Sequence, residues 1–386
     1  MSGKAEQPPA SGRAEEGDEA VSYRAAGVDY VGLDAAKRQA MAAALATSAQ
    51  LPARGARALD DSRGEPAFVF ELGGRTLALV VEGLGTKSII ARQVLEEQGV
   101  NRFADVAYDT VAAIVNDLCC VGALPLAVNA YFATGGSSWY REPARAQALL
   151  LGWQRGCLDA GCAWGGGESP SLSGIVAEEE IELAGAAVGA VPEGRGPILG
   201  AELAAGDEIV LVASSGLHAN GASLARLLAS RLDAGYATPL PGCGETLGQA
   251  LLAPSCIYVA LVAQLLEDGA ALTYISHVTG HGLLKLMRAR RELTYRLQAL
   301  PAVPAVLSFL ASEAGLDDRA AYQTLNMGTG LALYCPAGDG EAIVRAARQS
   351  GFGALLGGHV EEGRRRVVLE PLGISFEGSE LELAPS

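Results

Sequence analysis

The stretch FADVAYDTVAAIVNDLCCVGA (103–123) predicts a long buried helix, because its apolar residues recur at helical spacing and the run ends at a glycine. The β-branched run RTLALVVEG (75–83) precedes it, and the apolar run PLAVNAYFAT (125–134) follows it directly; both are typical of strands. Strand and helix patterns that alternate in this way favour the α/β class. The helix also carries acidic and amide residues, which are costly in an apolar interior unless they are paired or bind a ligand.

Further helices and strands extend this pattern on both sides. We expect helices at 34–50, 143–161, 222–230, 254–269, 283–291 and 340–351, and strands at 179–191, 208–215 and 327–336. Between residues 191 and 207 the pattern breaks into proline, glycine and charge, which indicates a domain boundary. The chain of 386 residues therefore predicts two α/β domains, at 21–192 and 200–375. Residues 1–20 are predicted to be a disordered tail, and residues 376–386 a flexible C-terminus.

Composition limits the classes of partner. The net charge of −15 argues against nucleic acid and anionic membranes, because phosphate groups are bound by an excess of lysine and arginine. We therefore expect a small-molecule partner. The seven cysteines form no C-x-x-C pair, no signal peptide pattern is present, and no apolar run reaches the roughly 18 residues that span a bilayer. These features predict a reduced, cytoplasmic protein.

Acidic residues in the first half indicate a metal-bound phosphate. Glu82 ends a strand, Asp109 and Asp117 lie on the 103–123 helix, and Glu168 follows three glycines. For any one of them, a helix cap or an ion pair is the alternative. As a set they favour Mg²⁺, which prefers a few carboxylates together with the phosphate oxygens of a ligand.

Glycine turns supply matching phosphate contacts. In VEGLGTKSII (81–90), Gly83 and Gly85 allow backbone N–H groups to approach a phosphate, and Lys87 carries a positive charge. The spacing is not that of a P-loop, because one residue separates the second glycine from the lysine. GGGES (165–169) is a second such turn, for which a tight exit from a strand is the alternative.

Two loops in the second half combine histidines with hydroxyl and amide groups. SSGLHANGASLAR (214–226) places Ser214, Ser215, His218 and Asn220 before a helix. A helix N-terminus with such donors can bind an anion, although an ordinary serine or asparagine cap is the alternative.

The segment HVTGHG (277–282) has a similar composition, with His277, Thr279 and His281. Three of the four histidines of the chain therefore lie on these two loops. The ligand spacing does not match a zinc site, and no hydrolase, kinase or dinucleotide-binding motif is present.

Taken in order, these segments resemble the phosphoribosylformylglycinamidine cyclo-ligase family, also called aminoimidazole ribonucleotide synthetase. The opening SYRAAGVD resembles the family's S-Y-K-x-A-G-V-D, and VEGLGTK resembles T-D-G-V-G-T-K. The remaining matches are DTVAAIVNDLCCVGALPL, YFATG, GGGES, SSGLHANGASLAR and HVTGHG. The resemblance covers nearly the whole chain after its first twenty residues.

The resemblance implies two α/β domains, with the first domains of two chains pairing strands into a barrel-like homodimer and the second domain an α/β sandwich. It also implies a ligase of purine biosynthesis that uses ATP and Mg²⁺. ATP phosphorylates the formyl amide oxygen of formylglycinamidine ribonucleotide, the amidine nitrogen attacks, and phosphate leaves as the imidazole of aminoimidazole ribonucleotide closes. Catalysis then depends on positioning and electrostatic stabilisation.

The matched positions carry implied roles. Catalytic roles fall on Lys87, His218, Asn220 and His277. Metal binding falls on Glu82, Asp109, Asp117 and Glu168. Binding of ATP or substrate falls on Arg24, Gly83, Gly85, Thr86, Asn116, Gly166, Gly167, Ser214, Ser215, Thr279, Gly280, His281 and Asn326.

Five positions depart from the family pattern. Glu82 replaces Asp, Arg24 replaces Lys, Asn129 replaces an acid, His281 replaces Gly and Met327 replaces Cys. Two alternatives therefore stay open. One is a divergent paralogue that uses ATP to activate an amide or carboxylate oxygen of another small substrate, as in specialised metabolism. The other is a non-catalytic dimer that binds a nucleotide.

Overall fold

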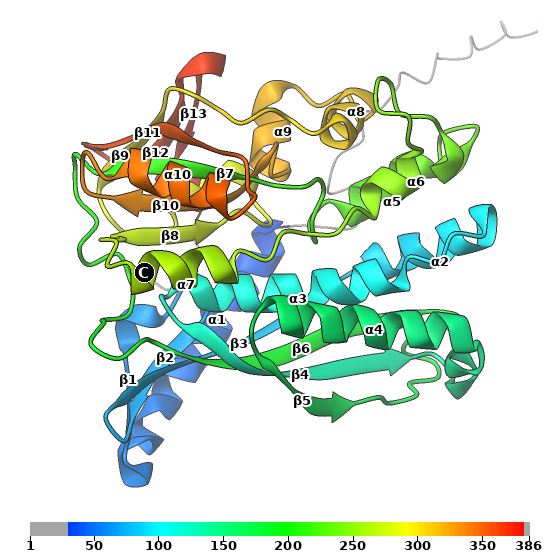
Figure 1. Cartoon of the computed structure of the whole chain (residues 1–386), viewed down its shortest axis with the longest axis horizontal. Helices are drawn as coiled ribbons and strands as arrows, with labels where there is room; N and C mark the ends of the chain where they lie inside the picture. The colour runs from blue at the N-terminus through cyan, green and yellow to red at the C-terminus, as the bar shows by residue number, and fades with distance from the viewer. Residues whose placement is uncertain (1–29, 382–386) are drawn as a thin grey trace, which may run out of the picture.

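Two β-sheets, one in each half of the chain, form the framework of the computed structural model, which describes residues 30–381 (Figure 1). The first sheet has six strands in the order β1-β2-β3-β6-β4-β5, and the second has seven in the order β13-β12-β9-β11-β7-β10-β8. The α/β class predicted from the sequence is confirmed. The predicted tail at 1–20 and the predicted role of Arg24 lie outside the described residues.

The strands of each sheet come from one half of the chain. The first sheet contains β1 (Ala56–Ala58), β2 (Phe68–Leu72), β3 (Arg75–Gly83), β4 (Leu124–Thr134), β5 (Ala163–Glu168) and β6 (Ile181–Ala190). The second contains β7 (Glu208–Ala213), β8 (Tyr274–His277), β9 (Leu293–Leu297), β10 (Thr329–Cys335), β11 (Ala354–Glu362), β12 (Arg366–Leu369) and β13 (Ile374–Glu377).

The helices connect and cover these strands. The first half contains α1 (Tyr30–Thr47), α2 (Lys87–Gln98), α3 (Phe103–Cys120) and α4 (Pro143–Asp159). The second half contains α5 (Ala222–Ala229), α6 (Leu247–Leu251), α7 (Val259–Glu267), α8 (Ala305–Glu313), α9 (Asp318–Thr324) and α10 (Gly340–Gln349). Among the residues that the structure describes, no helix has the length and apolar character needed to cross a membrane.

Helix α3 is the central element of the molecule. It contacts β3 and β6 of the first sheet, α4 beside it, and α7 and β8 of the second domain (Figure 1). Its residues Val111, Ile114 and Leu118 are fully buried, and burial of each stabilises the fold by about 1.5–3 kcal/mol. Because the helix has neighbours from both domains, its polar side chains must find partners inside the protein.

The other face of the first sheet carries apolar side chains that are exposed in the single chain. Leu79 and Val81 on β3 are 44% and 70% exposed, and Leu126 on β4 is 53% exposed. Side chains alternate between the two faces of a strand, so the buried Ala78 and Val80 lie on the helix side. An exposed apolar face of this kind is typical of a protein interface.

Two of the predicted helices differ from the structure. The helix expected at 283–291 is a short 3-10 helix over Gly282–Met287, because His281 and Gly282 have left-handed backbone, with φ of 72° and 52°, and start a tight turn. The helix expected at 254–269 begins only at Val259. Residues 253–258 before it are not helical, since two of their backbone N–H groups donate to side chains of α3.

The prediction of a flexible C-terminus from residue 376 is wrong for the described part. Strand β13 continues to Glu377 and pairs with β12. Phe376 and Leu381 are fully buried, so the chain packs into the second domain up to the last described residue.

Candidate active site

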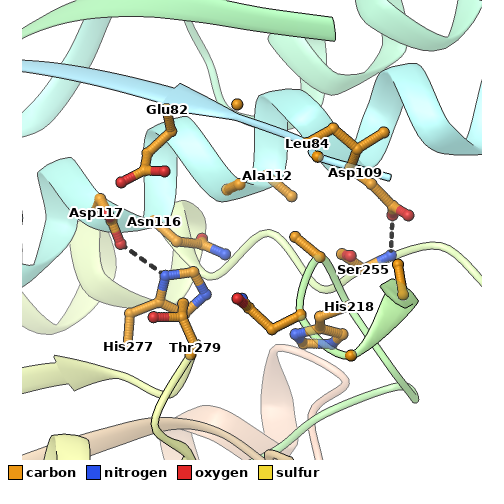
Figure 2. A pocket seen from close by; sticks show the side chains of 18 of the residues that line it. Glu82, Leu84, Asp109, Ala112, Asn116, Asp117, His218, Ser255, His277 and Thr279 are labelled. Carbon is orange, nitrogen blue, oxygen red and sulfur yellow. Dashed lines mark hydrogen bonds and ion pairs between the residues drawn. The ribbon is translucent and has the colours of Figure 1, made fainter. Parts of the chain in front are cut away.

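A cavity of about 390 Å³ lies between the two domains (Figure 2). The turn after β3 and one side of α3 form one wall, and loops before α5 and after β8 form the other. The sequence-predicted residues that line it are Glu82, Gly83, Gly85, Thr86, Asp109, Asn116, Asp117, His218, Asn220, His277, Thr279, Gly280 and His281. Motifs that are far apart in the sequence therefore meet in one place.

Two helix N-termini face this cavity. Helix α2 starts after Thr86 and α5 starts after Gly221, and neither receives a side-chain cap from the described residues. The first N–H groups of each helix can therefore bind an anion, which the helix dipoles also favour. The hydroxyl oxygens of Thr86 and Ser223 lie 3.1 Å apart and join the two turns across the domain boundary.

Three ionisable side chains meet in another part of the cavity. Nδ1 of His277 donates to Oδ1 of Asp117 at 2.7 Å, and the Glu82 carboxylate lies on the same side of the cavity (Figure 2). Burial, followed by the charge of Asp117, raises the pKa of Glu82 to about 7. Burial opposes ionisation of Asp117 as well, but the hydrogen bond from His277 holds the pKa of Asp117 below its usual value. Asp117 is thus the ionised member of the carboxylate pair.

A buried ion pair connects α2 to α3 beside the cavity. Nζ of Lys87 lies 2.6 Å from Oδ2 of Asp109 and donates to the carbonyl oxygen of His218 at 2.8 Å, and both charged side chains are fully buried. Oδ1 of Asp109 accepts from the backbone N–H of Ser255 at 2.6 Å (Figure 2). Lys87 therefore faces protein acceptors and does not line the cavity, which differs from the expectation that it offers its charge directly to a phosphate.

His218 is neutral and acts as a hydrogen-bond acceptor within its own loop. Its Nε2 accepts from the backbone N–H groups of Ser215 at 3.1 Å and Cys256 at 3.4 Å, which places the ring proton on Nδ1. Burial, with the charges of His277 and Lys87, lowers the pKa of His218 to about 3. Its Nε2 is therefore not available as a base for a substrate.

Asn116 lines the cavity, but its amide group holds the second domain. Oδ1 accepts from the backbone N–H of Tyr258 and Nδ2 donates to the carbonyl oxygen of Cys256, both at 2.9 Å. These bonds, with the Asp109 bond to Ser255, hold the segment before α7 against α3. Asn116 and Asp109, which the sequence predicted to bind ligands, thus fix the two domains relative to each other.

Ser214, Ser215 and Asn326 do not line the cavity, although the sequence predicted that they bind ATP or substrate. Ser214 Oγ donates to Asn326 Oδ1 at 2.8 Å, and Asn326 Nδ2 donates to the carbonyl oxygen of Gly216 at 2.8 Å. Ser215 Oγ donates to the carbonyl oxygen of Pro254 at 2.6 Å. Their polar groups brace the loop that carries His218.

Three residues other than glycine have left-handed backbone in the described chain, and all lie in or near this site. They are His218, His281 and Met327, with φ of 56°, 72° and 43°. Such conformations cost free energy and persist where the surrounding structure imposes them, often at functional sites. Two of the three line the cavity.

The glycine-rich strand β5 is separate from the cavity. Gly166, Gly167 and Glu168 are exposed at the edge of the first sheet and do not line the cavity. A Cβ atom at Gly167 would lie 2.0 Å from the carbonyl oxygen of Ala130, so close packing of β5 on β4 requires this glycine.

The four acids predicted to bind Mg²⁺ do not form one cluster, because Asp109 is bonded to Lys87 and Glu168 lies on β5. Within residues 30–381, no group of three or more His, Cys, Asp or Glu side chains is placed to hold a metal ion. Glu82 and Asp117 remain as a pair at the cavity.

Sequence reasoning missed three polar residues that line the cavity, namely Ser223, Ser255 and Lys285. Ser223 lies in the motif SSGLHANGASLAR (214–226) and faces the cavity as part of the first turn of α5. Lys285 lies in the segment that helical spacing had assigned to an ordinary α-helix. No local pattern marks it as a cavity residue.

Comparisons with known proteins match both halves of the chain. The family model for the AIR synthase related protein N-terminal domain matches residues 64–191, and the model for the C-terminal domain of the same family matches residues 204–370.

Curated relatives and a solved structure agree with this match. The phosphoribosylformylglycinamidine cyclo-ligase of Clostridium kluyveri is 33% identical over 80% of this chain and 89% of its own. The enzyme of that name from Methanobrevibacter smithii is 28% identical over 94% of this chain and 99% of its own. The crystal structure of the hydrogenase maturation protein HypE in complex with ATP shares the fold, with a TM-score of 0.56 and 18% identity over 79% of this chain and 85% of that chain. The two sheets, the cavity between them and these matches together establish that the chain belongs to the AIR synthase related family.

Proposed function

We propose that this protein is an ATP-dependent cyclo-ligase that converts formylglycinamidine ribonucleotide to aminoimidazole ribonucleotide. One observation carries the proposal: two uncapped helix N-termini and the carboxylates of Glu82 and Asp117 line the same interdomain cavity. Positive helix ends suit a polyphosphate, and paired carboxylates suit its metal ion. The curated relatives that carry the cyclo-ligase name support the choice of reaction.

The polyphosphate of ATP is proposed to lie against the first turns of α2 and α5. Their free N–H groups and the hydroxyl groups of Thr86 and Ser223 would donate to phosphate oxygens. Since the two turns belong to different domains, bound phosphate would also hold the domains together. HypE, which has the same fold, has been solved in complex with ATP, and this supports ATP as the ligand.

Glu82 and Asp117 are the residues that would hold Mg²⁺. Their donor set fits the ion, because Mg²⁺ usually takes one or two carboxylates and completes its shell with water and phosphate oxygens. When bound, Mg²⁺ supplies positive charge that stabilises the phosphoryl group during transfer to the formyl amide oxygen.

His277 is proposed to accept the proton of the attacking amidine nitrogen. Because its Nδ1 donates to Asp117, the lone pair of the neutral ring lies on Nε2. Asp117 would keep the ring in this tautomer and stabilise the imidazolium that forms. His218 is unsuited to this role, since its Nε2 already accepts backbone hydrogen bonds.

We also propose that the chain forms a homodimer through the outer face of the first sheet. Leu79, Val81 and Leu126 expose apolar surface there, and β5 leaves an edge at one side of the sheet. Pairing of two such faces would bury this surface. It would also place the exposed Gly166–Glu168 segment at or near the interface.

A second candidate, a ligase that activates an oxygen of a different small substrate, is favoured by one observation. The imidazole of His281 and the ammonium of Lys285 both belong to residues that line the cavity, and His281 stands where the resembled motif has glycine. These groups change the volume and charge offered to the second substrate.

The test is an assay of the purified protein with Mg-ATP and formylglycinamidine ribonucleotide, in which ADP and aminoimidazole are followed separately. Formation of both supports the first proposal. Nucleotide binding without turnover of this substrate supports the second candidate. Failure to bind Mg-ATP would exclude both.

A further inference from the structure

Lys285 lies in the wall of the interdomain cavity, and it is the one Lys or Arg among the described residues that line it. It belongs to the 3-10 helix Gly282–Met287, directly after the 277–282 loop, and is only 8% exposed. The cavity thus contains a cation of the protein as well as the Glu82 and Asp117 carboxylates.

The backbone that carries Lys285 is held tightly. Ser276 Oγ donates to the carbonyl oxygen of Lys285 at 2.7 Å, which ties the turn to β8 one residue before His277. At Gly282, a Cβ atom would lie 2.2 Å from the carbonyl oxygen of Tyr322, so the turn has no space to shift toward α9. The position of the backbone that carries Lys285 is therefore a property of the fold.

The charge of Lys285 acts on the two carboxylates of the cavity. Burial favours the neutral form of both carboxyl groups and acts to raise their pKa values, and the charges of Lys285 and Arg288 act in the opposite direction on both. Arg288 does not line the cavity, because its Nε donates to the carbonyl oxygen of Gly64 at 2.9 Å and lies 3.9 Å from Glu65 Oε2. Of the two cations, Lys285 is the one that shares the cavity with a ligand.

We propose that Lys285 is a resident cation of the active site, which offsets the Glu82 and Asp117 carboxylates in the nucleotide-free protein and binds the polyphosphate when the nucleotide is present. Paired carboxylates without a cation are a ready site for a divalent ion. With an ammonium group nearby, a free divalent ion is repelled and loses part of the negative charge that would attract it. The same ammonium group attracts a polyphosphate anion.

The proposal makes two predictions of opposite sign for a variant without the charge. Lys285→Met binds a free divalent ion more tightly, and it binds the nucleotide more weakly. A residue that only supported the fold would weaken both. The nucleotide part rests on the proposed function, whereas the metal part does not.

The experiment measures Mn²⁺ binding to the nucleotide-free protein by calorimetry, and Mg-ATP binding separately, for wild type, Lys285→Met and Lys285→Arg. Arg290→Met is the control, since it removes one positive charge from an exposed position five residues further on, outside the cavity. We expect Lys285→Met to bind Mn²⁺ about tenfold more tightly and Mg-ATP about tenfold more weakly. Lys285→Arg should stay near wild type for both ligands, and Arg290→Met should change neither.

Unchanged or weaker Mn²⁺ binding by a folded Lys285→Met variant overturns the proposal. If that variant does not fold, Lys285→Gln, which keeps a polar side chain without the charge, gives the same test. If wild type binds no Mg-ATP, the proposed function fails, and the Mn²⁺ comparison still decides the role of Lys285.

Discussion

Nδ1 of His277 lies 2.7 Å from Oδ1 of Asp117, and the two residues come from different domains. Helix α3 supplies the carboxylate and the end of β8 supplies the imidazole, so the pair exists only when the two domains are packed together. The proposed proton acceptor and one proposed metal ligand therefore depend on the same interdomain contact.

Replacement of Asp117 by Asn tests this contact. The amide keeps the volume of the side chain but cannot stabilise an imidazolium or bind Mg²⁺ as a carboxylate does, so kcat for ADP formation should fall by about 100-fold or more. Thermal unfolding should change little. Asp105→Asn is the matched control, because Asp105 lies on the same helix and pairs with Arg102 away from the cavity. Full activity of the Asp117 variant would rule out both roles.

The raised pKa of Glu82 predicts a pH dependence of stability. Burial and the charge of Asp117 raise this pKa from 4.5 to about 7, so the folded protein holds the proton more tightly than the unfolded chain does. The stabilisation from protonated Glu82 is complete below pH 4.5 and is lost as the pH rises through 7. Urea unfolding in EDTA should show that wild type loses about 2 kcal/mol relative to Glu82→Gln between pH 5 and pH 8. Parallel pH curves for the two proteins would contradict the assignment.

The buried ion pair of Lys87 and Asp109 should stabilise the fold only while both charges are present. Removing one partner leaves an uncompensated buried charge, so Lys87→Met should lower the free energy of unfolding by about 3–5 kcal/mol. Asp109→Asn removes the charge and keeps an acceptor for the N–H of Ser255. The double variant should be less destabilised than the sum of the single variants, as measured by urea unfolding. Simple additivity would mean that the two charges do not interact.

Gly152 on α4 should not tolerate a methyl group. An alanine at a helix position usually stabilises it relative to glycine by about 0.5–1 kcal/mol. A Cβ atom at Gly152 would lie 1.9 Å from the carbonyl oxygen of Ala104 on α3, so Gly152→Ala should instead destabilise by about 3 kcal/mol. Gln147→Gly, at an exposed position of the same helix, is the control for propensity alone and should cost about 0.5–1 kcal/mol. If Gly152→Ala were more stable than wild type, α3 and α4 could move apart to admit the methyl group without a cost in the free energy of unfolding.

The outer face of the first sheet predicts the effect of a charge on assembly. Leu79→Glu would place a carboxylate in the proposed interface of each copy, and sedimentation should show a shift from dimer to monomer. Leu158→Glu is the control, because Leu158 on α4 is 69% exposed and lies away from this face. If the dimer persists in both variants, or dissociates equally in both, this face is not the interface.

The sequence alone predicted the α/β class, the long buried helix, and most of the loops that line the cavity. Strand β3 spans the predicted residues, and α3 starts at the predicted Phe103. These features are local: apolar periodicity determines which side of an element is buried, and a glycine determines where a turn is possible. The order of the motifs was enough to indicate the family, which the comparisons then established.

Only the tertiary structure decided which of the polar residues face the cavity. Lys87 and Asp109 have the residue types of a phosphate and metal site, but their nearest partners are each other and the second domain. Glu168 has the same residue type and lies on an exposed strand, whereas Lys285 had no local signal and lines the cavity. A carboxylate or an ammonium group takes its function from the charges and hydrogen-bond partners within a few ångströms of it. Some of these, such as His277 beside Asp117 and Ser255 beside Asp109, lie more than a hundred positions away in the sequence.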